Sequence, residues 1–590
     1  MTTSRTGAPR SETPPASGTA PSASAGTRGR RRRRWAVTAG LLLLAGLPAL
    51  AGLVDLWLDR DGPYLPIGDH AVLAMAVDAV GEHETLLGAY SRFGWFHPGP
   101  MGTYLLAAFS FLLGGALQAL SAGALVINGL SAATAVWLVR RRAGVGPALA
   151  AVLVLTLSVR TLGDDFIRDS WNPHLPVLPL LAGVLLCWTA VRGDAWALPL
   201  VVVPMSLAVQ SHVGALPAAG AVTVVLGAGL LVRAVGHLRA RTATEKPGRP
   251  PVLPLRWLVA AGGALVLTAL LWLPTVIEQS TRTPGNAAVL YDHLLSGSPE
   301  EPTGTASGLR AVADEFGRLP ASLVGAGRPE SAFLPAFWPP AAIAVGLLAF
   351  AVTMALAVRR HRADVLWLGT LTLAVAVAGV AAVARIDGPP YPYLVQWTVV
   401  IGILAWTTVG AGLLPALAAA LRSAADRGRR PLRPRSALEV PLAVLATAAV
   451  VVAASGTGRA DTPSTDVTGD LVRLEEAVLA DLDQLGLRTG DDRPVVRVDF
   501  SQTSRPNRLV GTLWPGGGLV LALERDGVDV QIFPLWRTPF GNRYVERVED
   551  AGYVATLAYS DGTSPPREPW QRVLAVEGDL EVYGGVPPAG

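Results

Sequence analysis

The stretch RGRRRRRWAVTAGLLLLAGLPALAGLVDLWL, residues 28–58, places a run of arginines directly before an apolar segment of membrane-spanning length. A span needs about 20 apolar residues, and short loops rich in Lys and Arg stay in the cytoplasm. Apolar segments continue to alternate with Arg-rich and Arg-poor loops as far as residues 442–454, which follow five arginines between 427 and 435. This alternation predicts a polytopic α-helical membrane protein with a cytoplasmic N-terminus.

The composition supports the same class. Of 590 residues, 51% are hydrophobic and 16% are charged, whereas a soluble protein carries about 25% charged residues. The net charge of +4 is small, and the arginines lie mostly beside apolar runs. That placement indicates contact with a lipid bilayer rather than with nucleic acid. Cys187 is the one cysteine, so an intramolecular disulfide is excluded. The Ala, Gly, Arg and Pro bias is typical of GC-rich bacteria such as actinobacteria.

Hydropathy divides the chain into three parts: a disordered basic cytoplasmic tail (1–34), a membrane domain (35–455) and an extracytoplasmic domain (456–590). The membrane domain is predicted to contain about 11 spans, near residues 35–58, 120–139, 146–160, 175–191, 195–212, 214–232, 257–275, 337–357, 364–384, 394–415 and 437–455. The protein is therefore expected in the cytoplasmic membrane as a multi-pass protein, with its last domain outside.

The apolar segment 100–118 is the exception to this count. If it crossed the membrane, Arg140, Arg141 and Arg142 would lie outside, and so would every later basic loop. A re-entrant or juxtamembrane helix within an outer loop, residues 59–119, restores the agreement. The outer face would then also carry residues 161–174, 276–336 and 385–393.

The C-terminal residues 456–590 differ from the rest in their periodicity. We predict a small α/β domain, with helices at 471–487 and 543–551, strands at 495–500, 528–533, 553–559 and 573–583, and either a helix or a strand at 519–524. It has no Gly-rich phosphate loop and no metal-ligand spacing. An accessory or acceptor-binding role is therefore favoured over a second active site.

The first outer loop contains the most suggestive polar residue. Gly68-Asp69 opens a helical run, 69–80, and Asp69 is open to two interpretations. Asp is a good N-cap residue, but a carboxylate fixed at a helix start could also act as a general base. Further along the loop, Trp95 and Phe96 suit a membrane interface, while His97-Pro98-Gly99-Pro100 indicates a rigid turn that directs one imidazole.

The outer segment 160–174 contains two arginines, three aspartates, an amide, a Trp and a His between two spans. Such groups are costly beside hydrocarbon unless they are paired or line a water-filled cavity. Ion pairs Arg168–Asp169 and Arg160–Asp165 are the structural alternative to a functional role. Other spans end at the same face with polar clusters, and together these predict one shared cavity: Gln210 to His212, Glu278-Gln279, and Arg385 with Tyr391 and Tyr393.

Taken together, Gly68-Asp69, the aromatic-His97-Pro98-Gly99-Pro100 element, the basic run 140–142 and Trp171-Asn172-Pro173 resemble the membrane glycosyltransferases of the GT-C fold. The nearest resemblance is to the bacterial glycosyltransferase 39 and aminoarabinose-transferase-like group, over residues 35–400. In that family an acidic residue of the first outer loop is the catalytic base, and Asp69 matches it. A second acid often follows, where this chain has His70.

The resemblance implies an inverting hexosyl or pentosyl transfer from a polyprenyl-phosphate sugar to a hydroxyl or amine of an envelope glycan, lipid or protein. Asp69 would be the base, and Arg168, Arg385 or Arg92 would bind the phosphate, since Arg makes bidentate contacts to phosphate. No cofactor is implied, and a divalent metal is left open. Residues expected to hold the sugar or the acceptor are His70, Trp95, His97, Asp169, Trp171, Asn172, His174 and His212.

Two other classes compete with a transferase. A transporter or lipid flippase would place polar residues near the middle of the bilayer, often in repeated halves. Here the polar clusters lie at span ends on one face, and the sequence shows no clear internal repeat, which favours an enzyme. A non-catalytic scaffold of the same fold is the other alternative.

Overall fold

A computed structural model describes residues 23–244, 255–297, 300–326, 338–427, 434–488, 494–500 and 512–588. Of the described residues, 23–40 belong to a first unit, which contains the start of helix α1 (Ala23–Leu58). Residues 23–34 are thus helical, whereas the sequence predicted a disordered tail there. Residues from Leu41 onward form the second unit, which includes both the membrane helices and the C-terminal domain.

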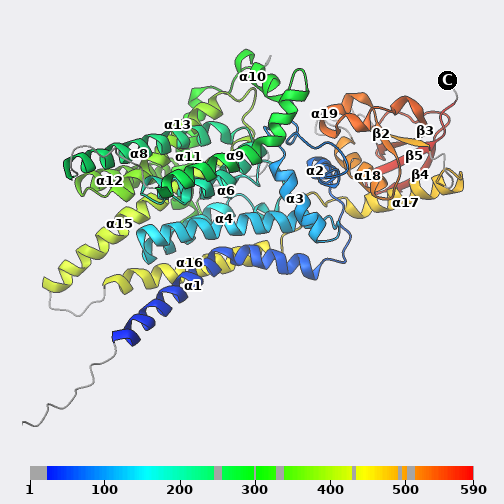
Figure 1. Ribbon diagram of the computed structural model, residues 1–590. Helices are drawn as coiled ribbons and strands as arrows, with labels where there is room; N and C mark the ends of the chain where they lie inside the picture. The colour runs from blue at the N-terminus through cyan, green and yellow to red at the C-terminus, as the bar shows by residue number, and fades with distance from the viewer. Residues whose placement is uncertain are drawn as a thin grey trace, which may run out of the picture. The chain divides into compact units, whose positions relative to one another are not determined.

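Helices dominate the second unit (Figure 1). In the described residues, eight helices are long and apolar enough to cross a membrane: α1, α4 (Ala119–Ala143), α8 (Ala215–Thr244), α9 (Leu255–Thr281), α12 (Pro340–Arg359), α13 (Ala363–Ala384), α15 (Val399–Arg427) and α16 (Pro434–Thr457). Three shorter apolar helices correspond to the other predicted spans: α5 (Val145–Arg160), α6 (Val177–Val191) and α7 (Ala197–Ser211). Every predicted span is thus an apolar helix, and the predicted fold class is confirmed.

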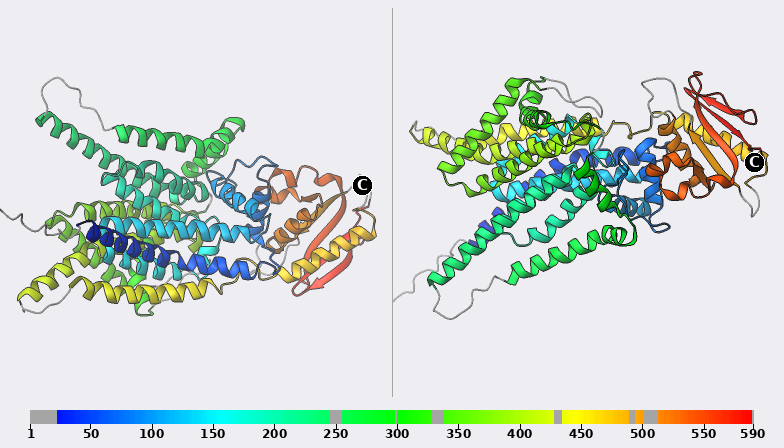
Figure 2. Two further views of the ribbon diagram at one scale, coloured as in Figure 1. Left: turned by 60° about the horizontal axis from the view of Figure 1, so that its bottom comes forward. Right: turned by 90° about the horizontal axis from the view of Figure 1, so that it is seen from above.

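Side-chain exposure shows which helices would face lipid. Every residue of α6 is buried among its neighbours, whereas α9 exposes Leu265, Val266 and Leu270 by 61% or more. Such a continuous apolar surface is unfavourable in water and suits hydrocarbon tails. The long helices run beside one another (Figure 2), with α5 packed against α4, α15 and α16. The chain is a multi-pass membrane protein.

Helix α3 (Met101–Leu112) occupies the segment that was predicted not to span. Its 12 residues give a length of about 18 Å, which is too short for a hydrocarbon core of about 30 Å. Gly114 and Gly115, both with positive φ, turn the chain before α4 begins at Ala119. The side of the membrane on which α3 lies stays a prediction.

The segment 276–336, which was predicted to lie outside, contains two helices that hydropathy did not indicate, α10 (Asn286–Ser296) and α11 (Thr305–Leu323). Helix α11 packs against α12, α13 and α15. Its Arg318 is buried and donates two hydrogen bonds of 2.8 Å to buried Glu315, which also accepts one from Thr398. A buried ion pair is stable only when its hydrogen bonds are satisfied. Because charged residues lower the mean hydropathy of the segment, a hydropathy profile does not identify α11 as a packed helix.

Short helical turns complete the chain between these elements: η1 (Phe166–Arg168), α14 (Pro392–Val395), η2 (Gln396–Thr398), η3 (Pro534–Trp536), α19 (Arg537–Phe540), η4 (Asn542–Tyr544) and η5 (Val548–Asp550).

The C-terminal domain is a mixed five-stranded sheet in the order β2-β1-β3-β5-β4. β1 (Val495–Phe500) pairs in parallel with β2 (Val530–Ile532) and β3 (Ala551–Tyr559), while β5 (Leu580–Gly585) pairs antiparallel with β3 and β4 (Arg572–Glu577). Helix α18 (Leu513–Arg525) packs on β1 and β2, and α17 (Thr468–Gln484) packs on β4 and β5. The predicted α/β domain is confirmed.

Three segments of this domain differ from the local predictions or decide between them. Residues 519–524 lie in helix α18. The predicted helix 543–551 is wrong, because the Gln531 side chain bonds the backbone at Arg543 and Arg547 and holds the chain in turns. The predicted strand 573–583 is two strands, because the chain reverses at Gly578, where φ is 55°.

Helix α2 (Gly68–Asp78), which begins with the predicted site, packs into the C-terminal domain. One apolar core contains Ala71, Ala74 and Met75 of α2 together with residues of α17, α18 and the sheet. Arg525 of α18 donates two hydrogen bonds of 2.9 Å to Asp78 at the other end of α2. The outer loop 59–119 and the C-terminal domain therefore form one packed structure, and α2 is fixed at both ends.

Candidate active site at the start of helix α2

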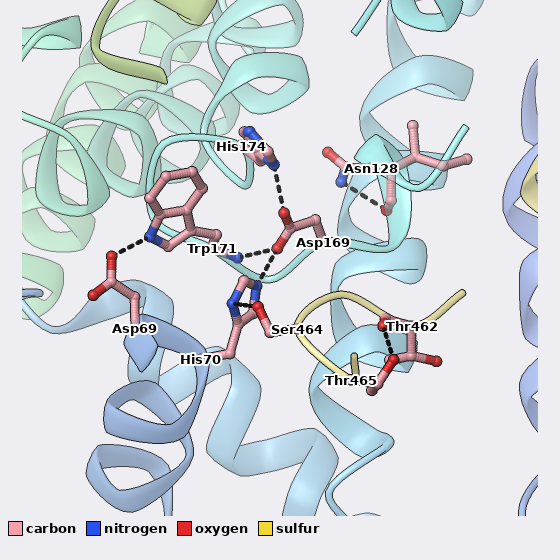
Figure 3. Close-up of polar contacts among 10 residues, drawn as sticks. Asp69, His70, Asn128, Asp169, Trp171, His174, Thr462, Ser464 and Thr465 are labelled. Atoms are coloured by element: carbon pink, nitrogen blue, oxygen red, sulfur yellow. Dashed lines mark hydrogen bonds and ion pairs between the residues drawn. The ribbon is translucent and has the colours of Figure 1, made fainter. Parts of the chain in front are cut away.

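Asp69 lies in the first turn of α2, but it is not the N-cap. The N-cap is Ile67, and no side chain caps the helix. Instead, Asp69 Oδ1 accepts a hydrogen bond of 2.5 Å from the Tyr90 hydroxyl. Its Oδ2 accepts one of 2.9 Å from the Trp171 indole N–H (Figure 3). The N-cap interpretation is therefore wrong, and both carboxylate oxygens are oriented by side chains from other segments.

Local backbone geometry explains why the helix starts here. Gly68 has a φ of 56°, a left-handed conformation that glycine adopts at little cost. A Cβ at this position would contact the Trp514 ring at 3.4 Å. Tyr90 remains a hydrogen-bond donor across the physiological range, because burial and then the charge of Asp69 raise the pKa of its hydroxyl far above the usual value.

Asp169 is the centre of a buried hydrogen-bond network behind Asp69. Its Oδ1 accepts from His70 Nε2 at 2.6 Å and from the Trp171 backbone N–H at 2.8 Å, and its Oδ2 accepts from His174 Nδ1 at 2.6 Å (Figure 3). Burial acts to raise the pKa of Asp169, but the two histidines hold it well below its usual range. Asp169 thus positions Trp171, whose indole in turn holds Asp69.

His70 extends this network to the chain that follows α16. Its Nδ1 lies 2.8 Å from Ser464 Oγ (Figure 3). Burial lowers the pKa of His70, but the charge of Asp169 and its hydrogen bond outweigh this, so the net shift is upward. A protonated His70 donates to both Asp169 and Ser464. His70 is therefore a structural link, and it does not line the cavity described below.

His97, Trp95 and His212 form a second buried group. His97 stacks on His212 at 5.1 Å and meets Trp95 edge-on at 5.3 Å. Its Nδ1 accepts the Val213 backbone N–H at 3.0 Å, and its pKa is held well below the usual value by burial and then by His212. The turn after His97 thus directs its imidazole against the end of α7. None of these three residues lines the cavity described below, and a contact between them and a sugar stays a prediction.

The three arginines predicted to bind phosphate lie in different places. Arg168 is fully buried, bonds Asp55 at 2.9 Å and the Ala460 carbonyl, and is therefore corrected to a structural ion pair. Its partner is Asp55 and not Asp169. Arg385 is exposed and donates to the Leu294 carbonyl of α10 at 2.6 Å. Arg168 is therefore not available to a phosphate, whereas phosphate binding by Arg385 stays a prediction.

Arg92 is the arginine that connects to the site. It donates to the Asp387 carbonyl at 2.9 Å, and its guanidinium lies 4.7 Å from the Phe93 ring centroid and 5.7 Å from that of Tyr391. Tyr391 stacks on Tyr393 at 5.9 Å, and Tyr393 lies 5.3 Å from Trp171. An aromatic row therefore leads from an exposed cation to the indole that holds Asp69.

A cavity of about 430 Å³ opens beside Asp69. It lies between α2, the loop 83–90 and residues 539–546 of the C-terminal domain. Of the predicted residues, Asp69, Trp171 and Asn172 line it, and so do Tyr90 and Phe96 of the aromatic stretch in the first loop. The lining also includes residues that were not predicted to belong to the site: Arg282, Phe540, Asn542, Arg543, Tyr544 and Glu546. The described residues contain no group of His, Cys, Asp or Glu side chains arranged to hold a metal ion.

No protein-family model matches the sequence, and no curated protein matches it. Among solved structures, ArnT from Cupriavidus metallidurans bound to undecaprenyl phosphate covers 94% of this chain and 99% of its own, with 15% identity and a TM-score of 0.47. Its apo state covers 93% and 98%, with 14% identity and a TM-score of 0.46.

The arabinofuranosyltransferase AftD from Mycobacteria covers 95% of this chain and 40% of its own, with 14% identity and a TM-score of 0.37. Structural similarity of this degree does not establish a function for this chain.

Proposed function

We propose that this protein is an integral membrane glycosyltransferase that moves a sugar from a polyprenyl-phosphate donor to an acceptor hydroxyl at the outer face of the cytoplasmic membrane. Asp69 is the general base, and one displacement inverts the anomeric carbon. The observation that carries the proposal is the setting of Asp69: a carboxylate fixed by Tyr90 and Trp171 at the wall of a cavity lined with aromatic rings.

The chemistry follows from this setting. Hydrogen bonds from a phenol and an indole orient the carboxylate, and the cavity admits an acceptor hydroxyl to it. Preorganisation of this kind lets a base accept a proton as the new bond forms. Trp171 has a second role in the proposal, because its ring faces both the cavity and Tyr393. An aromatic ring there suits the apolar face of a transferred sugar.

The leaving group is a lipid phosphate, which gains negative charge as the sugar departs. Arg92 is proposed to stabilise that charge, since a guanidinium presents several N–H donors to phosphate oxygens. Glu300 lies 3.6 Å from the Arg92 guanidinium. Because this contact is long and solvent-exposed, Glu300 offsets the positive charge of Arg92 only in part. The ArnT structure named above contains undecaprenyl phosphate, which is a ligand of the class proposed here.

The test is a donor-consumption assay on the full chain reconstituted in lipid vesicles. A panel of polyprenyl-phosphate-linked pentoses and hexoses, labelled in the sugar, is supplied with hydrophobically tagged glycan acceptors. A transferase releases free polyprenyl phosphate as the label appears on an acceptor. A flippase would move intact donor between leaflets with its sugar–phosphate bond unbroken, and a scaffold would do neither; either result would refute the proposal.

Arg92→Ala is expected to raise the KM for the donor or lower the rate by roughly ten- to a hundredfold, because a hydrogen bond to a charged group contributes about 1.5–3 kcal/mol. Arg92→Lys should restore part of this, since lysine lacks the bidentate geometry. Initial rates at several donor concentrations measure the effect. The matched control is Arg60→Ala. Arg60 is an exposed arginine of the same loop as Arg92, and its guanidinium lies over the Trp57 ring of α1. Equal activity in all three variants would leave Arg92 as a surface residue.

A further inference from the structure

We propose that the cavity beside Asp69 is the acceptor site, that residues 539–546 of the C-terminal domain form one of its walls, and that the acceptor is an uncharged saccharide. The inference rests on the proposed glycosyl transfer, and it adds the class of acceptor and the role of the C-terminal domain.

The position of Asp69 separates the two substrates. The described residues lining the cavity include Tyr90 and Trp171 but not Arg92, Tyr391 or Tyr393. The cation and the two tyrosines therefore reach Trp171 from outside the cavity. In an inverting displacement, the acceptor hydroxyl and the phosphate occupy opposite sides of the anomeric carbon. If the phosphate lies on the Arg92 side of the anomeric carbon, the acceptor therefore lies on the side of the cavity.

In the proposed glycosyl transfer, one bond to the anomeric carbon forms as another breaks, and Asp69 takes up the proton. The acceptor oxygen forms a bond to the anomeric carbon and its proton passes to the Asp69 carboxylate. The bond between that carbon and the phosphate oxygen breaks, and its electron pair leaves on the polyprenyl phosphate. Asp69 lies at the boundary of the two regions, because one of its oxygens is held by Trp171, which contacts both.

The lining of the cavity indicates what kind of acceptor fits. Aromatic rings are abundant, and rings stack on the apolar faces of sugars. Amide groups of Asn172 and Asn542 provide both donors and acceptors for hydroxyls. The wall formed by α2 is apolar and exposes Val72, Leu73 and Ala76 to the cavity. This combination of rings, amides and apolar surface suits a polyol better than an ion.

The two arginines that line the cavity are paired with carboxylates. Arg282 lies 3.4 Å from Glu84, and Arg543 lies 2.9 Å from Glu524. A phosphorylated or acidic acceptor needs cations that are not already neutralised by carboxylates. Both arginines of the lining instead have an acidic partner, and Glu546 adds a further negative charge. The site therefore disfavours an anionic acceptor.

The wall from the C-terminal domain is held in a defined conformation. The Gln531 side chain bonds the backbone on both sides of buried Tyr544, at Arg543 O and Arg547 N, at 3.0 and 3.1 Å. Asn542 and Glu546 are exposed and line the cavity. The volume falls within the roughly 300–1,000 Å³ of small-molecule sites, which is room for more than a single sugar ring.

Binding of saccharides to the full chain in lipid nanodiscs tests the inference without a need for turnover. The probes are alkyl-tagged neutral di- and trisaccharides of common pentoses and hexoses, their phosphorylated and uronic-acid counterparts, and the alkyl tag alone. Asn542→Cys, modified with a bulky maleimide, should weaken binding of the neutral probes at least tenfold. Glu549→Cys, modified in the same way, is the matched control, since Glu549 is exposed and does not line the cavity. The native Cys187 is buried.

Asp69→Asn separates this inference from the proposed function, because the variant should still bind neutral saccharides while it no longer transfers sugar. Binding that depends on Asn542, with no transfer from any polyprenyl-phosphate sugar, would preserve the saccharide site and refute the transferase. Three results would overturn the inference: no binding of any neutral probe, tighter binding of the anionic probes or of the tag alone, or equal binding by the two modified cysteine variants.

Discussion

Asp69→Asn is expected to reduce glycosyl transfer by at least about a hundredfold, since removing a positioned base costs roughly 10²–10⁴-fold in rate. Asparagine has nearly the same shape and can still accept from Tyr90 or Trp171, so the geometry around it should be kept. It cannot take up a proton at neutral pH. The measurement is the initial rate of label transfer at saturating donor, compared with that of the unchanged protein.

Folding should survive this substitution. Asp69 does not cap α2, so the expected loss is the interaction of its charge with the first helical turn, about 0.3–1 kcal/mol, together with one charge-assisted hydrogen bond, about 1.5–3 kcal/mol, because the amide nitrogen cannot accept. Asp61→Asn is the control, because Asp61 lies in the same outer loop and its side chain is 87% exposed. Full activity of Asp69→Asn would refute the assignment. Asp169 offers no replacement as the base, because it is buried between two histidines.

The sequence predicted features that depend on local patterns. The membrane helices follow from hydropathy and loop charge, and strand β1 from the alternation in Val495–Phe500. Asp69 was identified because it follows a glycine and begins a helix in an outer loop. Its partner Trp171 belongs to a segment whose density of polar groups already indicated a function.

Other features depend on contacts between distant residues, which one sequence does not reveal. Ser464 and His70 are 394 positions apart, and Arg525 and Asp78 are 447 apart. The proposed acceptor wall contains Asn542 and Glu546, and the sequence alone gave no reason to assign either residue to a site. Arg168 was assigned to phosphate because an arginine in a polar outer segment suggests a ligand, whereas its full burial against Asp55 requires the fold.

The packing of α2 also changes the expected role of the C-terminal domain. A separate accessory domain would be expected to detach from the membrane helices without affecting Asp69. Here Gly517 lies so close to α2 that a Cβ would contact Ala71 at 3.5 Å, and a Cβ at Gly518 would lie 2.9 Å from the Pro66 carbonyl. The domain therefore supports the helix that begins with Asp69, in addition to forming a wall of the cavity.

Asp169→Asn is expected to cause the largest loss of stability among single substitutions at the site, on the order of 3–5 kcal/mol, because removing one partner of a buried pair leaves the other charge uncompensated. The free energy of unfolding, obtained from tryptophan fluorescence of the purified protein in detergent, measures the loss. Asp499→Asn is the control. Asp499 pairs with Arg497 at 3.0 Å, but both are partly exposed, and such pairs contribute only about 0–1 kcal/mol.

The pH dependence of this loss distinguishes the network from ordinary packing. The pKa of Asp169 is lowered, so its contribution is present above the unfolded value of about 3.9 and is lost as the pH falls through the folded value. The pKa of His70 is raised, so its contribution is complete below about 6.5 and is lost as the pH rises through the folded value. The two windows overlap between about pH 4 and pH 6.5.

Asp169→Asn should therefore reduce the free energy of unfolding most in that pH range, and the reduction should become smaller at higher pH as His70 loses its proton. Asp69 and Asp165 also act on His70 and remain in the variant, so part of the pH dependence should persist. If the loss is the same at every pH, Asp169 contributes to stability through packing and neutral hydrogen bonds, and His70 is uncharged in the folded protein.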